Sequence, residues 1–240
     1  MQAPLHRVIP HSNTGTVTLR EAYATSLASD TDAPWVGLCM VASIDGSTVV
    51  DGVSGGLSSD NDSGVLLQLR SIAQVVVVGA GTVRGEGYGK PSTPGQRIGV
   101  VTGSGSIDPT SSLFASGAGF LITSESARLD ARIERDVEVI RAGTDHVDLR
   151  AAFASIPQVR PDVEFIQVEG GATLNAAIAE ADLFDELNIT TSPATVNGSG
   201  PRLFHGGADH SRRYELAQLL VDDESFVFSR WRRRGERTSP

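Results

Sequence analysis

Residues 75–82 read Val-Val-Val-Val-Gly-Ala-Gly-Thr, and this stretch decides the fold class of the chain. Consecutive β-branched residues favour a strand, and a strand without polar positions is typical of one buried on both faces of a sheet. In an open α/β sheet, ligands bind beyond the carboxyl ends of strands, where glycines let them approach the backbone. The stretch therefore predicts a buried strand leading into a nucleotide-binding loop, although a tight strand-to-helix turn also explains it.

The same alternation of strands and helices extends outward from this stretch. Residues 35–44 form a nearly continuous apolar run that ends at Asp45-Gly46, which predicts a central strand. Further strands are predicted at residues 99–102, 119–123, 137–141 and 163–168, and helices at residues 18–27, 65–72, 127–135, 149–155 and 173–180. The alternation predicts an α/β fold with a mostly parallel central sheet flanked by helices.

The two ends of the chain differ from this pattern. Residues 186–192 and 225–231 have strand patterns with no long helix between them, which predicts antiparallel C-terminal edge strands. Thr18 and Glu21 have the spacing of a capping box for an N-terminal helix. Because no linker or repeat divides the sequence, we expect one main domain over residues 35–231. An N-terminal extension then covers residues 1–34, and a flexible tail with clustered arginines covers residues 232–240.

Composition limits the classes of partner. The 240 residues are 40% hydrophobic and 20% charged, with a formal net charge of −9, which argues against a broad nucleic-acid-binding surface. No apolar run approaches the roughly 18 residues of a membrane span. The single cysteine, Cys39, provides neither a disulfide framework nor a cysteine-based zinc site. We expect a cytoplasmic protein that binds a small molecule and no metal, nucleic acid or membrane.

A second glycine loop follows the predicted strand at residues 163–168. It reads Glu169-Gly170-Gly171-Ala172-Thr173-Leu174 and lies immediately before a predicted helix. Unbonded amides at a helix N-terminus, approached through glycine, favour an anionic pyrophosphate. Because Glu169 would repel a phosphate, we expect its side chain to face a substrate instead.

A third candidate is Ser43-Ile44-Asp45-Gly46, at the end of the first predicted strand. The two-residue period of a strand places Ser43 and Asp45 on one side, where both can face a ligand. Asp-Gly is also a common turn pair. All three loops follow predicted parallel strands, at the edge where such sheets form their binding crevice.

These loops, at residues 41–46, 79–83 and 168–174, resemble in order and spacing the signature segments of the bacterial riboflavin-biosynthesis pyrimidine reductase domain. The likeness covers roughly residues 35–231. It implies a dihydrofolate-reductase-like fold, a homodimer, and NADPH-dependent reduction of 5-amino-6-(5-phosphoribosylamino)uracil to the ribitylamino product. The sequence is most similar to the stand-alone actinobacterial type.

The resemblance also implies site residues. The cofactor-binding candidates are Val41, Gly79, Gly81, Thr82, Thr102, Gly170, Gly171, Ala172, Thr173 and Leu174. The substrate-binding candidates are Ser43, Asp45, Ser54, Arg70, Glu86 and Glu169. Asp45 and Glu169 are the expected catalytic residues, because either carboxyl group, or a water beside it, can supply the proton that completes reduction. The candidates for the cofactor's 2′-phosphate are Arg84, Arg97 and Arg128.

Several departures from the family pattern keep alternatives open. Leu38 stands where a lysine is usual, and Glu86-Gly87-Tyr88 replaces an Asp-Asp-Pro segment. The zinc-ligand motifs of the deaminase domain often fused to this family are absent, so we expect a separate deaminase. A dihydropterin or dihydrofolate substrate and a non-catalytic NADPH-binding sensor remain alternative hypotheses. For the homodimer, the chain offers an apolar edge at residues 226–228.

Overall fold

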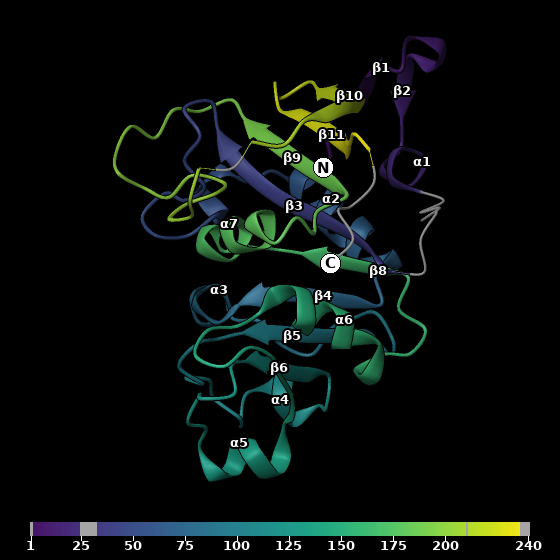
Figure 1. The fold of residues 1–240 in the computed structure, drawn as a ribbon. Helices are drawn as coiled ribbons and strands as arrows, with labels where there is room; N and C mark the ends of the chain where they lie inside the picture. Colours follow the sequence, from purple (N-terminus) through teal and green to yellow (C-terminus); the bar gives the residue numbers. More distant parts are fainter. Residues whose placement is uncertain (1, 25–32, 210, 236–240) are drawn as a thin grey trace.

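The computed structural model describes residues 2–24, 33–209 and 211–235. The described strands are β1 (Leu5–Ile9), β2 (Gly15–Val17), β3 (Trp35–Ser43), β4 (Val75–Gly79), β5 (Arg97–Val101), β6 (Gly119–Thr123), β7 (Glu138–Arg141), β8 (Phe165–Val168), β9 (Glu186–Ser192), β10 (Tyr214–Asp222) and β11 (Val227–Arg233). The described helices are α1 (Leu19–Tyr23), α2 (Asp60–Ile72), α3 (Ala80–Glu86), α4 (Ser112–Ala115), α5 (Ala131–Asp136), α6 (Leu149–Val159) and α7 (Ala172–Glu180). All the strands of the described residues form one sheet, in the order β2-β1-β10-β11-β9-β3-β8-β4-β5-β6-β7 (Figure 1).

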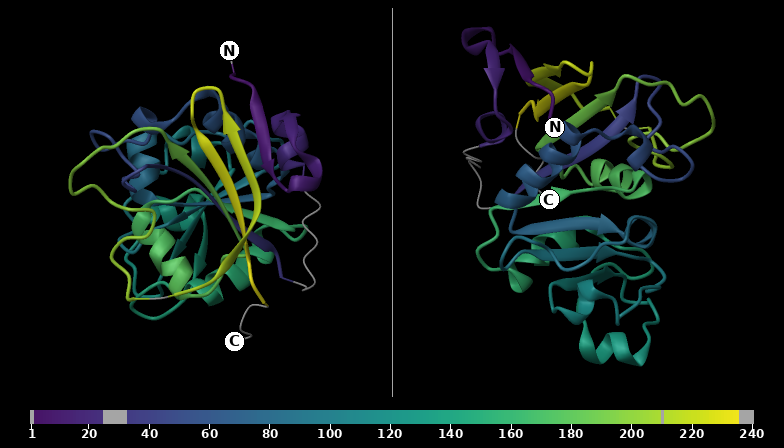
Figure 2. Two further views of the ribbon diagram at one scale, coloured as in Figure 1. Left: turned by 90° about the horizontal axis from the view of Figure 1, so that it is seen from above. Right: turned by 180° about the vertical axis from the view of Figure 1, so that it is seen from behind.

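The sheet is parallel from β9 to β7, and its central strands β3, β8, β4, β5 and β6 are buried on both faces. Along β4, Val75 and Val77 pack into one core cluster, whereas Val76 and Val78 pack into another. This two-residue alternation follows from strand geometry. Helices α6 and α7 cover the first face, and α2 lies on the opposite face (Figures 1 and 2). The predicted α/β fold with a mostly parallel central sheet is confirmed.

The other side of the sheet is antiparallel and joins the two ends of the chain. Strand β11 pairs antiparallel with both β9 and β10, and β1 pairs antiparallel with β10. Antiparallel C-terminal strands were predicted, but β10 was missed, and β9 also pairs parallel with β3. The N-terminal residues expected to be an extension supply β1 and β2, which complete this side of the sheet.

Two expectations about the C-terminal residues are wrong. The segment around Phe226 and Phe228 is not an exposed edge, because β11 lies between β10 and β9 and both rings are buried. Its backbone is therefore already paired on both sides and is not free to pair with a second copy of the chain. The tail expected from residue 232 begins later, because β11 continues to Arg233, whose guanidinium lies 2.9 Å from Asp182 Oδ1. Residues 236–240 lie outside the described residues.

Two arginines of the C-terminal cluster, Arg230 and Arg233, are buried and structural, whereas Arg234 is exposed. Arg230 is 6% exposed. Its Nε lies 3.3 Å from Glu186 Oε1, and its guanidinium carbon lies 4.7 Å from the centre of the Tyr23 ring. A buried arginine needs such partners, since an unpaired buried charge is costly. Arg230 thus connects β11 to β9 and to the N-terminal helix α1.

Several helices begin or end differently from the prediction, and α1 and α2 are the two that bear on the rest of the fold. The Thr18–Glu21 capping box of α1 is confirmed, but α1 ends at Tyr23, and residues 25–32 lie outside the described part of the chain. Helix α2 begins at Asp60 rather than at residue 65, because the Ser59 side chain caps it by accepting from the Asp62 amide. No helix among the described residues has the length and apolarity needed to cross a membrane.

Candidate active site

Two adjoining cavities lie beyond the carboxyl ends of the central strands. The larger has a volume of about 660 Å³ and the smaller about 540 Å³. Four residues line both cavities: Gly81, Thr82, Gly171 and Ala172. The two glycine loops predicted from the sequence therefore come together and form the wall at which the cavities meet.

Glycine is required where the two loops approach each other. The Gly79 amide donates to the Gly170 carbonyl at 2.7 Å. A Cβ atom on Gly171 would lie 3.0 Å from Thr82 Oγ1, whereas a Cβ atom on Gly81 would meet no atom within 4 Å. The contact at Gly171 leaves little room for a side chain, and the backbone at Gly81 is open to a ligand.

The smaller cavity contains most of the predicted cofactor residues. It is lined by Gly79, Gly81, Thr82, Thr102, Gly171, Ala172, Thr173 and Leu174. The other two candidates lie elsewhere. Val41 lines the larger cavity, and Gly170 adopts a φ of 90° beside Met40, where a Cβ atom would lie 2.9 Å from the sulfur.

The start of α7 and the Thr102 hydroxyl are two of the polar features of this cavity. No side chain caps α7 at Gly171, so its first-turn amides keep the unbonded donors of a helix N-terminus. Thr102 Oγ1 accepts from the Gly105 amide at 3.1 Å and retains its own proton for donation. Amides and a hydroxyl in one cleft suit an anionic, hydroxyl-bearing ligand.

The three arginine candidates for the 2′-phosphate are separated by the structure. Arg84 lines the smaller cavity and donates to the Ser106 carbonyl at 3.0 Å. Arg97 donates to Glu138 at 2.8 Å and lies over the Phe120 ring, on the side of β5 away from the cavity. Arg128 is exposed and is not part of the cavity lining. Arg84 is therefore the candidate in position to meet a ligand there.

Glu169 lies in the wall of the larger cavity and is enclosed by hydrogen-bond donors. Arg70 binds it with two bonds, from Nε at 2.7 Å and from a terminal nitrogen at 2.5 Å. The Tyr88 hydroxyl donates at 2.6 Å and the Gln167 amide at 2.8 Å. The bidentate arginine neutralises Glu169, which explains how a carboxylate is tolerated directly before a phosphate-type loop.

Tyr88 and Gln167 are partners of Glu169 that the site prediction did not include. Burial and then the Glu169 charge raise the pKa of Tyr88 well above its ordinary value, so the phenol remains a donor. Gln167 precedes Glu169 by two residues on β8, which is the spacing that puts side chains on one face. That spacing was the available sequence signal for Gln167, whereas Tyr88 is brought close only by the fold.

Ser43 and Asp45 share one side of the chain, as predicted, but they bind each other and a neighbouring loop. The Ser43 hydroxyl donates to Asp45 at 2.5 Å, and the amides of Val196 and Asn197 donate at 3.0 and 2.8 Å. The Ser43 hydroxyl and these amides hold the pKa of Asp45 well below its ordinary value. Asp45 is not among the residues that line either cavity.

Ser54 and Glu86 meet at the rim of the larger cavity. The Ser54 hydroxyl donates to Glu86 at 2.7 Å, and both residues line the cavity. Arg70 lines neither of the two large cavities, because its guanidinium is directed to Glu169. The predicted substrate residues are thus divided between the cavity wall and the contacts behind it.

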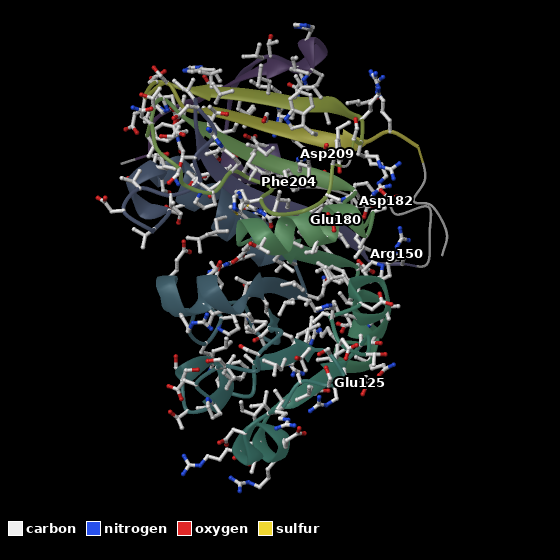
Figure 3. The ribbon with its side chains drawn as sticks, turned by 60° about the vertical axis from the view of Figure 1, so that its left-hand side comes forward. Glu125, Arg150, Glu180, Asp182, Phe204 and Asp209 are labelled. Atoms are coloured by element: carbon white, nitrogen blue, oxygen red, sulfur yellow. The ribbon has the colours of Figure 1, made fainter. Side chains whose placement is uncertain are left out.

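The segment between β9 and β10 holds together elements that line the two cavities. The Leu203 carbonyl accepts from the Asn175 amide group at 2.8 Å, and the Pro201 carbonyl accepts from the Thr48 amide at 3.0 Å. Phe204 and Glu180 lie where this connection passes α7 (Figure 3), and Phe204 packs edge-on against Phe184. The connection therefore ties α7 to the loop that follows β3. The described residues contain no cluster of three or more potential metal ligands.

Comparisons with known proteins place this geometry in a family. Residues 34–228 match the model of the RibD C-terminal domain family. The chain is 26% identical over 188 residues to riboflavin biosynthesis protein RibD of Bacillus amyloliquefaciens, with 73% of this chain aligned but only 50% of that protein. It is 27% identical over 185 residues to the 2,5-diamino-6-ribosylamino-4(3H)-pyrimidinone 5′-phosphate reductase of Methanothermobacter thermautotrophicus, covering 72% of this chain and 84% of the relative.

Solved structures agree with this assignment. A pyrimidine reductase-like protein of Corynebacterium diphtheriae superposes with a TM-score of 0.78 at 25% identity, covering 92% of this chain and 100% of that one. The dihydrofolate reductase of Enterococcus faecalis shares the fold, with a TM-score of 0.50 at 16% identity over 84% of this chain and 97% of that one. The predicted resemblance is confirmed, and the chain belongs to the RibD C-terminal domain family.

Proposed function

We propose that this chain is a pyrimidine reductase that uses NADPH to reduce the ribosyl group of a 6-(5-phosphoribosylamino)pyrimidine to a ribityl group. The observation that carries the proposal is the shared wall of the two cavities at Gly81, Thr82, Gly171 and Ala172. A cofactor in the smaller cavity and a substrate in the larger cavity would meet at this wall. The name of the Methanothermobacter relative supports a reaction of this kind.

The residues of the smaller cavity fit a dinucleotide cofactor. The open backbone at Gly81 and the uncapped first turn of α7 suit the pyrophosphate. Thr102 would hydrogen-bond the adenosine ribose, and Arg84 would pair with the 2′-phosphate that distinguishes NADPH from NADH. Val41, in the larger cavity, would lie on the nicotinamide side.

The reaction needs both a hydride and a proton. When bound, NADPH supplies the hydride. The ring-opened imine of the ribosylamino group gains this hydride at carbon and a proton at nitrogen, which gives the secondary amine of the ribityl product. Water or a substrate-facing carboxyl group would deliver the proton. The low pKa of Asp45 works against a role as the acid, and its bonds suit it to hold the loop at Val196 and Asn197 instead.

Glu169 would act through its position. Its two oxygens accept four bonds from Arg70, Tyr88 and Gln167, so it presents a fixed, neutralised wall to the larger cavity. A rigid wall opposite the cofactor orients the reacting carbon, which is a large part of catalysis between two bound reactants.

Turnover with NADPH tests the proposal. The purified chain would be mixed with NADPH and a phosphoribosylamino-pyrimidine, in either the uracil or the diamino-pyrimidinone form. Loss of nicotinamide absorbance and a product heavier by two hydrogens are expected. Reduction of dihydrofolate alone would move the activity to a pterin, and NADPH binding without any turnover would favour the sensor.

Cofactor preference tests the role of Arg84. Replacing Arg84 with Gln should weaken NADPH binding about tenfold while leaving NADH binding unchanged, because a single ionic bond to phosphate is lost. Arg128→Gln is the matched control, since Arg128 is exposed outside the cavity. Equal losses for both cofactors in Arg84→Gln would contradict this role.

A further inference from the structure

Asp62 is a buried carboxylate of the larger cavity that the proposed reaction has not used. It lies in the first turn of α2, lines the cavity, and is 9% exposed. The Ser58 hydroxyl donates to its Oδ2 at 2.6 Å, and the Thr190 hydroxyl on β9 is its second side-chain partner. These two hydroxyls fix the direction of the carboxylate from two different elements.

Asp62 has no cationic partner among the described residues. Its hydrogen-bond partners are neutral, and none of the described residues that line the cavity is a lysine, arginine or histidine. Burial raises the pKa of Asp62, although the Ser58 and Thr190 hydroxyls act in the opposite direction. Buried charges are normally paired, so an unpaired one beside a cavity favours a ligand that completes its bonding.

The other candidate carboxylates are already occupied. Glu169, the other buried carboxylate in the cavity wall, is bound by Arg70 through two bonds. Asp45 accepts from Ser43 and two backbone amides and lies outside the cavity lining. Asp62 is therefore the buried carboxylate among the described residues of this wall that has hydroxyl partners and no protein cation.

The chemical complement of a carboxylate is a pair of adjacent N–H donors. On a 2-aminopyrimidin-4(3H)-one ring, the N3–H and the 2-amino group are adjacent and donate in parallel, which matches the two oxygens of a carboxylate. On a uracil ring, position 2 carries a carbonyl instead, and its lone pairs oppose those of the carboxylate. The two candidate pyrimidines thus differ at the atom that Asp62 can recognise.

We propose that Asp62 is the specificity-determining residue of this reductase and selects the 2-amino-pyrimidinone substrate over the uracil. The inference rests on the proposed function, since it takes the larger cavity as the pyrimidine site. The Methanothermobacter relative is named for a substrate of this 2-amino class. A consequence is that the hydrolytic deamination at position 2 acts on the reduced product of this chain rather than before it.

Kinetics with the two pyrimidines test the inference. We would measure kcat/KM of the full chain with NADPH for 2,5-diamino-6-(5-phosphoribosylamino)pyrimidin-4(3H)-one and for 5-amino-6-(5-phosphoribosylamino)uracil. The 2-amino substrate should be preferred at least about 100-fold, because a site that bonds an N–H strongly rejects an analogue without it. Equal use of both substrates, or preference for the uracil, would overturn the inference and leave the proposed function intact.

Replacing Asp62 with Asn provides a second test, in which the substrate preference should change. An asparagine amide offers one acceptor and one donor, which match the N3–H and C2 carbonyl of a uracil. Asp62→Asn should therefore invert the preference, by lowering kcat/KM for the 2-amino substrate and raising the relative use of the uracil. Asp51→Asn is the control, since Asp51 is an exposed carboxylate on the loop before α2, outside the cavity lining.

The possible outcomes are distinguishable. A proportional loss for both substrates in Asp62→Asn would indicate a structural role and overturn the inference. If that variant does not fold, equal use of the two pyrimidines by the wild-type chain, or preference for the uracil, still overturns the inference. Absence of turnover of either pyrimidine by the wild-type chain would overturn the proposed function and the inference with it.

Discussion

Two walls of the larger cavity each carry a buried carboxylate, but only one of the two carboxylates is paired with a cation. The β8 wall, formed by Glu169 with Arg70, Tyr88 and Gln167, neutralises its carboxylate with a bidentate arginine. The α2 wall, formed by Asp62 with Ser58 and Thr190, supplies only hydroxyls. A neutralised carboxylate serves as scaffold, whereas a carboxylate without a cation remains available to a ligand.

The largest effect is expected from removing the cation of the β8 wall. Arg70→Met should lower the free energy of unfolding by about 3–5 kcal/mol, because it leaves Glu169 buried without its counter-charge. Urea denaturation followed by circular dichroism would measure it. Removing both charges, in Arg70→Met with Glu169→Gln, should recover much of the loss.

An exposed pair provides the control for this variant. Arg135→Met breaks the Arg135–Asp136 pair, whose side chains are 70% and 51% exposed, and should leave stability unchanged. If Arg70→Met were as mild as Arg135→Met, the β8 wall would not depend on charge neutralisation and the contrast between the walls would fail.

A smaller effect is expected from Tyr88→Phe. The variant removes one hydrogen bond to the Glu169 carboxylate and should cost about 2 kcal/mol, since bonds to charged groups are stronger than neutral ones. The same denaturation experiment applies. In the Arg70→Met background the loss should be larger, because Tyr88 is then one of the few remaining donors to Glu169, and strict additivity would contradict the shared network.

The corresponding change on the α2 wall is Ser58→Ala. Loss of the hydroxyl bond to Asp62 should cost about 1 kcal/mol and raise the pKa of Asp62 further, because that hydroxyl stabilises the charged form. A carboxyl carbon NMR titration would follow Asp62 directly. Ser71→Ala is the control, since Ser71 is an exposed serine on α2, and it should leave the titration of Asp62 unchanged.

The smallest expected effect is the pH dependence of stability that arises from Asp62, and its sign distinguishes the two walls. The raised pKa of Asp62 means that the folded state holds its proton to a higher pH than the unfolded chain does. Wild-type stability should therefore fall as pH rises from the ordinary aspartate pKa of 3.8 through the raised value. Asp62→Asn lacks this loss, so its stability relative to wild type should increase across that window. The stability of Asp62→Asn would be compared with that of wild type at acid and at neutral pH. If this difference turned against the variant at neutral pH, Asp62 would not be unpaired.

The parallel half of the fold was predictable because its strands are buried on both faces. A run such as residues 75–78 has no polar position, and the glycine loops that follow these strands mark the crevice directly. The antiparallel side was not predictable in the same way. Strand β10 carries Glu215 and Gln218, and its pairing with β1 depends on residues at the opposite end of the chain.

The sequence predicted where the candidate site lies better than it predicted what each residue does there. The glycine loops after the predicted strands indicated where the crevice lies, and the family resemblance supplied the individual cofactor candidates, most of which line the smaller cavity. The partners of Glu169 come from α2, from the segment that follows α3 and from β8, and only the fold brings them together. Asp62 was missed because the helix was expected to begin at residue 65, which left it in a loop. Its signal was Ser59 followed three residues later by an acidic residue, a typical helix start.

Because β1 pairs with β10, this part of the sheet can form only late in synthesis. Residues 5–9 are synthesised long before their partner residues 219–222, so β1 cannot pair with β10 until most of the described residues have been made. Until then, of its two neighbours in the sheet, β1 has only β2 available for pairing. Once β10 has formed, its outer edge is open to any strand until β1 arrives, and a second nascent chain can compete for it.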